Sequence, residues 1–147
     1  MAARSRIAPH QLDFVLKRLP PLRPSSRTRA LAGDPAFTST PFTKLASFNH
    51  GGIFVGRFTG QTPWERHRHG DELVHVLAGE VDLTVRKASG PVHVTLTAGS
   101  VFVVPRGHWH RQRTRGAVAL LTATPTPTDI SFDAEPRSTR RTQRRRS

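Results

Sequence analysis

The chain has 147 residues, which is enough for one domain built around one hydrophobic core. Its formal net charge is +13, but the basic residues gather near the two ends, and residues 31–133 carry a net charge of only +2. The chain holds no cysteine, which excludes disulfides, thiolate metal ligands and a cysteine nucleophile.

The first forty residues are expected to form an extension ahead of the domain. Apolar residues recur at helical spacing within residues 9–19 and stop at Pro20-Pro21, so a short amphipathic helix is expected there. Residues 24–29 contain Ser, Arg and Thr but no large apolar residue, which predicts a linker. The chain has no apolar run of signal-peptide or membrane-span length. We therefore expect a soluble protein, and the absence of cysteine is compatible with a cytoplasmic location.

From residue 45 onward, short apolar runs are separated by turn residues at intervals of about ten, which predicts an all-β sandwich or barrel. Val81, Leu83 and Val85 alternate with polar residues, so that strand is expected to cover a core with one face. Val92, Val94 and Leu96 do the same, and the turn residues between the two runs predict an antiparallel hairpin. The expected strands are 53–58, 73–77, 81–87, 92–97, 101–104, 108–113 and 117–124.

The prolines that follow Thr124 are poorly suited to a strand ladder, so the domain is expected to end shortly after that residue. We assign residues 1–40 to the extension, 41–128 to a β-barrel domain and 129–147 to a disordered basic tail. The arginine-rich end has no apolar residue to bury. Contact of such tails with nucleic acid is expected to be at most non-specific and salt-sensitive.

Histidines and a glutamate cluster in two segments of the strand-rich region. His67 and His69 lie two residues apart, so on a strand both imidazoles point to the same side. A two-residue turn follows, and a returning strand can bring Glu72 to the same point. A second pair, His108 and His110, follows another turn, and either residue can supply a fourth ligand. Imidazole and carboxylate ligands together indicate a site for one divalent transition metal ion.

These segments resemble the two motifs of the cupin superfamily. Residues 60–79 are similar to G-x5-H-x-H-x3–4-E-x6-G, and residues 99–110 to G-x5-P-x-G-x2-H-x3-N. Two departures concern the first motif, since Gly60 lies one residue too far upstream and only two residues separate His69 from Glu72. In the second motif, Thr114 replaces the closing Asn. By position, the resemblance implies a metal site made of His67, His69, Glu72 and His110.

The resemblance further implies a small single-domain cupin with a double-stranded β-helix (jelly-roll-like) barrel, to which the residue pattern adds the short N-terminal helix and the flexible tails. It also implies a homodimer, for which the apolar stretch before residue 60 is a candidate surface. His108 is then expected to line the pocket or to hydrogen-bond to a ligand. His75, at the opposite parity from Glu72, is expected to pack or to face solvent.

Such a site suits Fe(II), Mn(II), Ni(II), Co(II) or Zn(II) and leaves coordination positions open. We favour a metal-binding cupin. One form of it is a metal-dependent enzyme of dioxygenase or isomerase type that acts on a small oxygen-rich molecule. The alternative is a non-enzymatic cupin that binds a small ligand or shapes an interface. A third class is an accessory protein whose basic tails contact nucleic acid. The fold alone does not choose among these.

Overall fold

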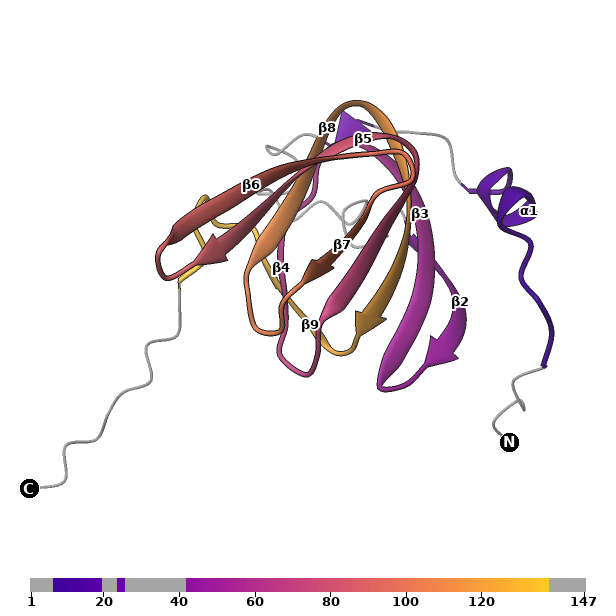
Figure 1. Cartoon of the computed structure of the whole chain (residues 1–147), viewed down its shortest axis with the longest axis horizontal. Helices are drawn as coiled ribbons and strands as arrows, with labels where there is room; N and C mark the ends of the chain where they lie inside the picture. The colour runs from indigo at the N-terminus through magenta and orange to yellow at the C-terminus, as the bar shows by residue number, and fades with distance from the viewer. Residues whose placement is uncertain (1–6, 20–23, 26–41, 138–147) are drawn as a thin grey trace, which may run out of the picture.

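The computed structural model describes residues 7–19, 24–25 and 42–137 (Figure 1). Helix α1 (Leu12–Leu16) lies within the expected segment but is shorter than it. The expected linker begins with a two-residue strand, β1 (Pro24–Ser25), which pairs in parallel with β3 (Gly51–Gln61). Residues 26–29 lie outside the described residues. The arginine run of the C-terminal tail lies outside them too. The described part of the chain contains no helix long and apolar enough to cross a membrane.

The described strands form one curled, almost entirely antiparallel sheet, which confirms the all-β prediction. β8 lies at its centre and pairs with β3, β4 and β5. β5 also pairs with β6 and β7, and β3 also pairs with β2. The strands are β1 (Pro24–Ser25), β2 (Phe42–Phe48), β3 (Gly51–Gln61), β4 (Trp64–His67), β5 (Glu72–Lys87), β6 (Gly90–Thr97), β7 (Val101–Val104), β8 (His110–Pro125) and β9 (Thr128–Ser131).

β5 and β8 each run for 16 residues, so the prediction that each was two separate strands is wrong. The glycine at the expected break in β5 bends that strand and does not end it. Gly79 has a φ of +80°, and a Cβ there would lie 2.1 Å from the backbone oxygen of Ala117 on β8. The register between the two strands shifts on both sides of Gly79. Glycine therefore lets β5 pass close to β8 while changing direction.

The core lies on the inner face of the curled sheet. Val81, Leu83 and Val85 are all buried, which confirms the predicted alternation in β5. In β8, Val118 and Leu120 face the same core. The even-numbered residues at the start of β8 are also buried, but they are polar: His110, Gln112 and Thr114. The inner face is thus apolar along one part of β8 and carries buried polar groups along the other.

The predicted hairpin between β5 and β6 is present, with Lys87 paired to Gly90 across a two-residue turn. The expected apolar face of β6 is only partly buried. Leu96 is 7% exposed, whereas Val92 near the turn is 39% exposed. The hairpin extends away from the rest of the sheet (Figure 1), so the residues near its tip have less of the core to pack against.

The chain after Pro125 continues the sheet, which corrects the predicted end of the domain. β9 pairs antiparallel with β4, so the tail predicted to be disordered from residue 129 is ordered at least through that strand. Beyond β9, the Trp64 Nε1 group donates to the backbone oxygen of Ala134 at 3.2 Å, and Arg86 donates to that of Pro136 at 2.8 Å. Pro125 is the last residue of β8, and Pro127 lies in the turn between β8 and β9, so neither proline interrupts a strand.

Candidate metal centre

β4 carries two of the candidate ligands on one side. Glu65 and His67 lie two residues apart on this strand, so both side chains point toward the inner face. His67 is 3% exposed, whereas Glu65 is half-buried. Trp64, at the opposite parity, contacts Arg111 on the outer face, with the guanidinium carbon 4.4 Å from the ring centroid. Because side chains alternate along β4, Glu65 and His67 lie on the inner face and Trp64 lies on the outer face.

β5 and β8 supply the other two candidate ligands at their first residues, Glu72 and His110. His110 is the β8 partner of Glu65 on one side and of Val85 on the other. The loop before β8 docks on the end of β4, where the Gly107 amide donates to the His67 carbonyl at 2.8 Å. Gly107 has a φ of +80°, a conformation that glycine adopts without strain. This docking brings the two motif segments together.

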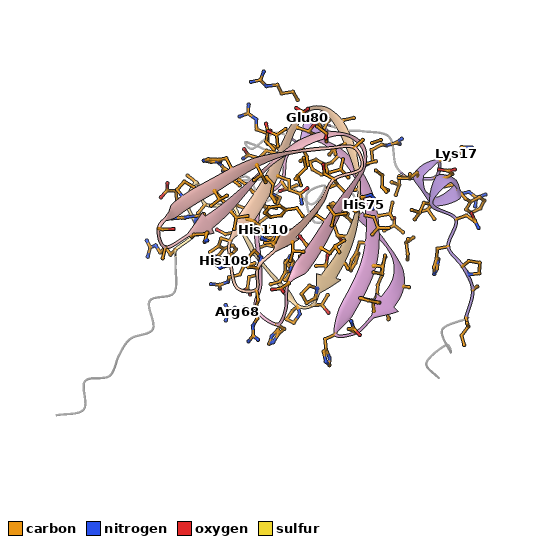
Figure 2. The ribbon with its side chains drawn as sticks, viewed as in Figure 1. Lys17, Arg68, His75, Glu80, His108 and His110 are labelled. Carbon is orange, nitrogen blue, oxygen red and sulfur yellow. The ribbon has the colours of Figure 1, made fainter. Side chains whose placement is uncertain are left out.

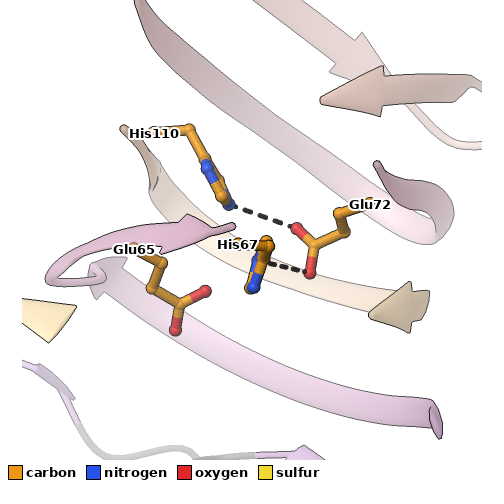
Figure 3. A group of neighbouring side chains, drawn as sticks. All are labelled: Glu65, His67, Glu72 and His110. Atoms are coloured by element: carbon orange, nitrogen blue, oxygen red, sulfur yellow. Dashed lines mark ion pairs between the residues drawn. The ribbon is translucent and has the colours of Figure 1, made fainter. Parts of the chain in front are cut away.

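The four side chains converge on one point (Figure 3), and a candidate ligand atom of each lies within 4.8 Å of those of the others. His67 Nε2 is 3.1 Å from Glu72 Oε2, and His110 Nε2 is 3.2 Å from Glu72 Oε1. The two imidazole centroids are 5.1 Å apart. Glu72 thus lies between two histidines, and Glu65 faces them from β4.

Three atoms at this point are buried and form no hydrogen bond of acceptable geometry with any described residue. They are His67 Nε2, His110 Nε2 and Glu72 Oε1. Buried polar atoms are normally satisfied, since an unpaired one costs about 1–3 kcal/mol. Two imidazole nitrogens and carboxylate oxygens are suitable ligands for a divalent transition metal. The cluster of Glu65, His67, Glu72 and His110 could therefore hold a metal ion.

Each of the three buried ligand groups is oriented by a further contact. His110 Nδ1 donates to the His108 carbonyl at 3.1 Å, which places the proton on Nδ1 and leaves Nε2 facing the cluster. His67 Nδ1 lies 3.0 Å from the Thr128 hydroxyl on β9. The Thr124 hydroxyl donates to Glu72 Oε2 at 2.7 Å. β9, which begins at the last residue of the domain expected from the sequence, therefore supports a candidate ligand directly.

Burial and contacts within the cluster shift the pKa of Glu72 downward and the pKa values of His110 and Glu65 upward. Burial raises the pKa of Glu72, but its contacts with His110 and His67 outweigh burial and hold that pKa well below its usual range. Burial lowers the pKa of His110, and Glu72 more than compensates, so the net shift is upward. Burial also raises the pKa of Glu65, and the neighbouring Glu72 charge adds to this effect. Glu72 therefore carries the negative charge that pairs with the histidines.

The structure brings together three of the four ligands predicted from the sequence, His67, Glu72 and His110. His69 is exposed and lies outside the cluster, two residues beyond the end of β4. Glu65, which was not predicted, stands with the other three. The sequence does hold a signal for Glu65. Four residues separate His67 from Glu72, which fits the family interval of three or four, whereas only two separate His69 from Glu72. With His67 as the second ligand of the motif, the first falls on Glu65.

The two additional histidines, His108 and His75, are not members of the cluster. His108 contributes its backbone carbonyl to His110, and its own Nδ1 lies 3.0 Å from the Arg86 carbonyl. His75 is a β5 residue of the opposite parity from Glu72 and pairs with Leu121. Figure 2 shows His108 beside His110 and His75 further along the sheet. Of the two, only His108 contacts a residue of the cluster.

A family model and solved structures match this chain, the first bearing on its domain family and the second on its fold. Residues 58–124 match the cupin domain family. A cupin superfamily protein from Desulfitobacterium hafniense DCB-2 has a TM-score of 0.51 at 23% identity, covering 58% of this chain and 76% of that one. Hydroquinone 1,2-dioxygenase from Sphingomonas sp. TTNP3, with 4-hydroxybenzoate bound, has a TM-score of 0.50 at 14% identity, covering 67% and 73%.

A cupin-2 domain containing protein from Shewanella frigidimarina has a TM-score of 0.48 at 20% identity, covering 61% of this chain and 79% of that one. The comparison with curated proteins gave no match. At these identities the solved structures bear on the fold alone. The sheet topology, the matched segment and the two motifs lead to the same assignment: the chain contains a cupin domain and has the cupin fold.

Proposed function

We propose that this protein is a metal-dependent cupin in which one divalent transition metal ion is bound by Glu65, His67, Glu72 and His110. The observation that carries the proposal is the buried convergence of His67 Nε2 and His110 Nε2 on the Glu72 carboxylate, at 3.1 and 3.2 Å, in contacts that lack hydrogen-bond geometry. A metal ion would satisfy all three at once. Glu65 replaces His69 in this ligand set because its carboxylate belongs to the same cluster.

The proposed ligand set consists of two imidazoles and two carboxylates, which balance the charge of a divalent ion. Carboxylate oxygens favour harder metal ions than imidazole nitrogens do. Compared with a three-histidine site, this ligand set is therefore expected to have a higher affinity for Fe(II) and Mn(II) relative to Zn(II), Co(II) and Ni(II). Four protein ligands leave two positions on an octahedral ion. A bound ion would supply Lewis-acid polarisation to a small substrate with adjacent oxygen atoms.

The protein groups around the cluster would keep the ligands in place before the ion arrives. The His108 carbonyl and the Thr128 hydroxyl orient the two imidazoles, and Thr124 holds Glu72. Such outer contacts commonly affect metal affinity by 10- to 100-fold. A reaction of dioxygenase or isomerase type is compatible with this arrangement. The fold is shared with a dioxygenase, but the cupin fold does not itself assign a reaction.

The test is elemental analysis of protein purified without a chelating resin, for the parent and three variants. We expect near-stoichiometric metal in the parent and in His69→Ala, and loss of metal in His110→Ala and in Glu65→Ala. His69→Ala is the matched control, because it removes an exposed histidine from the same segment. Loss of metal in His69→Ala with retention in Glu65→Ala would restore the ligand set expected from the sequence. A parent that binds none of the five ions in solution would refute the proposal.

The burial of the cluster favours a second candidate, a non-enzymatic cupin whose metal is structural. His67, Glu72 and His110 are each no more than 3% exposed, and closed coordination is typical of structural metal sites. Azide titration of the Co(II)-substituted protein separates the two candidates. A change in the visible spectrum would indicate open coordination positions and favour the enzyme. An unchanged spectrum at saturating azide would favour the structural role.

A further inference from the structure

The outer face of the sheet carries a recess of about 340 Å³, lined by residues of β3, β5, β6 and β8. This volume lies within the range of small-molecule binding sites in proteins, about 300–1,000 Å³. It has room for roughly ten water molecules, which is more than a bare inorganic ion requires. Among the lining residues are Gln61, Asp82, Thr84, Thr95, Arg111 and Arg113.

The recess is separate from the candidate metal centre, although both use the same strand. Residues of β8 alternate, so that His110 and Gln112 are buried on the inner face while Arg111 and Arg113 lie on the outer face. The recess therefore opens on the opposite side of β8 from the cluster. A ligand there would not contact the residues that we propose to bind the metal.

The charged groups in the recess are predominantly basic. Arg111 and Arg113 are two residues apart on one face, so their Cα atoms are separated by about 7 Å. The acidic residue among those lining the recess is Asp82, which accepts a hydrogen bond from the Thr95 hydroxyl at 2.7 Å. Arg113 is exposed and forms no ion pair with any described residue. Among the residues that line the recess, two arginines therefore stand against one aspartate.

Arg111 is held in position by the aromatic ring beneath it. Its guanidinium carbon lies 4.4 Å from the centroid of Trp64, which is a cation–π geometry. Trp64 is itself 4% exposed and donates to the Ala134 carbonyl at 3.2 Å. An arginine restrained in this way loses less conformational entropy on binding a ligand. Its planar group presents paired N–H donors suited to carboxylate and phosphate oxygens.

We propose that this recess is a second binding site, which takes a small organic anion through a carboxylate or phosphate group. Arg111 and Arg113 bind the anionic group, and the hydroxyl and amide groups around them bind polar substituents. The proposal is independent of the metal centre, because it involves none of the proposed metal ligands. A concave recess with two arginines is suited to a small anion. A nucleic-acid backbone would instead lie along the exposed arginines of β8.

The test uses isothermal titration calorimetry and amide NMR shifts at about 150 mM salt, which screens general attraction to the basic chain. The probes are 3-phosphoglycerate, which has both anionic groups, and glycerol 3-phosphate and glycerate, which have one each. We expect saturable binding of 3-phosphoglycerate, with shifts confined to the residues that line the recess. The stronger of the two single-group probes identifies the anionic group that the arginines recognise.

Arg113→Gln is expected to weaken binding by roughly 10- to 100-fold, as loss of a charged hydrogen bond does. Arg115→Gln is the matched control, because Arg115 has the same charge and outward parity on β8 but does not line the recess. We expect it to change the affinity less than two-fold and expect neither variant to change the metal content. Equal losses in the two variants, shifts at the metal cluster, or no binding at millimolar probe would overturn the proposal. Equal losses together with duplex DNA binding would point to a nucleic-acid surface.

Discussion

Thr124→Val tests whether the carboxylate at the centre of the cluster is held by its hydroxyl partner. The substitution keeps the shape of the side chain but removes the donor to Glu72 Oε2, which lies 2.7 Å away. Glu72 is 3% exposed, so water does not readily replace the lost donor. A hydrogen bond to a charged group contributes about 1.5–3 kcal/mol. We expect the metal-free variant to lose stability of that size and the metal affinity to fall by about 10- to 100-fold.

Urea unfolding of the chelated protein measures the stability, and competition with a chromophoric chelator measures the metal affinity. Thr95→Val is the control, because Thr95 also donates to a carboxylate at 2.7 Å, but on the exposed outer face. It is expected to change stability by less than about 0.5 kcal/mol and to leave metal affinity unchanged. If Thr124→Val binds metal as tightly as the parent protein, Thr124 does not orient Glu72 for metal binding.

Three further substitutions, and a control for the first of them, test the fold around the site. Leu83→Ala, at a fully buried core position, should cost about 2–5 kcal/mol of unfolding free energy, whereas Val103→Ala, at a residue 49% exposed, should cost less than about 0.5. Gly79→Ala should cost about 1–3 kcal/mol or more through strain at positive φ, and an unchanged urea midpoint would contradict the close passage of β5 past β8. Asp129→Asn should cost no more than about 1 kcal/mol at pH 7. Hydrogen bonds from Arg68 and Arg66 hold the pKa of Asp129 below its ordinary value, so this difference should be present above pH 4 and disappear as the pH falls through the lowered pKa.

The parts of the fold that depend on local pattern could be predicted from the sequence. The alternation of Val81, Leu83 and Val85 gave the correct inner face, and the turn before Gly90 gave the correct hairpin. The breaks expected in β5 and β8 could not be judged locally. Whether a glycine such as Gly79 ends a strand or bends it depends on what packs against it, and the contact at Gly79 is with Ala117 on β8. β9 was missed because its partner, β4, is distant in the sequence.

The candidate site shows the same division between local and distant information. His67, Glu72 and His110 were predicted from motif positions, and all three lie in the cluster. The parity of a strand could not distinguish His69 from Glu65, because both have the same parity as His67. The end of β4 at His67 separates them, since the chain then turns and leaves His69 exposed. The predicted homodimer and cytoplasmic location stay predictions.

Glu65→His tests the consequence of having a glutamate where the shifted motif would have its first histidine. The variant sequence reads His-x-His67-x4-Glu72, which matches the family spacing, and it replaces an oxygen ligand with an imidazole. The charge of the proposed metal-bound site becomes more positive by one, and the ligand set becomes softer. We therefore expect affinity for Zn(II) and Ni(II) to rise relative to Mn(II). Competition between Mn(II) and Zn(II) in parent and variant measures the shift. An unchanged preference would show that residue 65 does not contact the metal, because a ligand of different hardness cannot leave the selectivity of its own site unaltered.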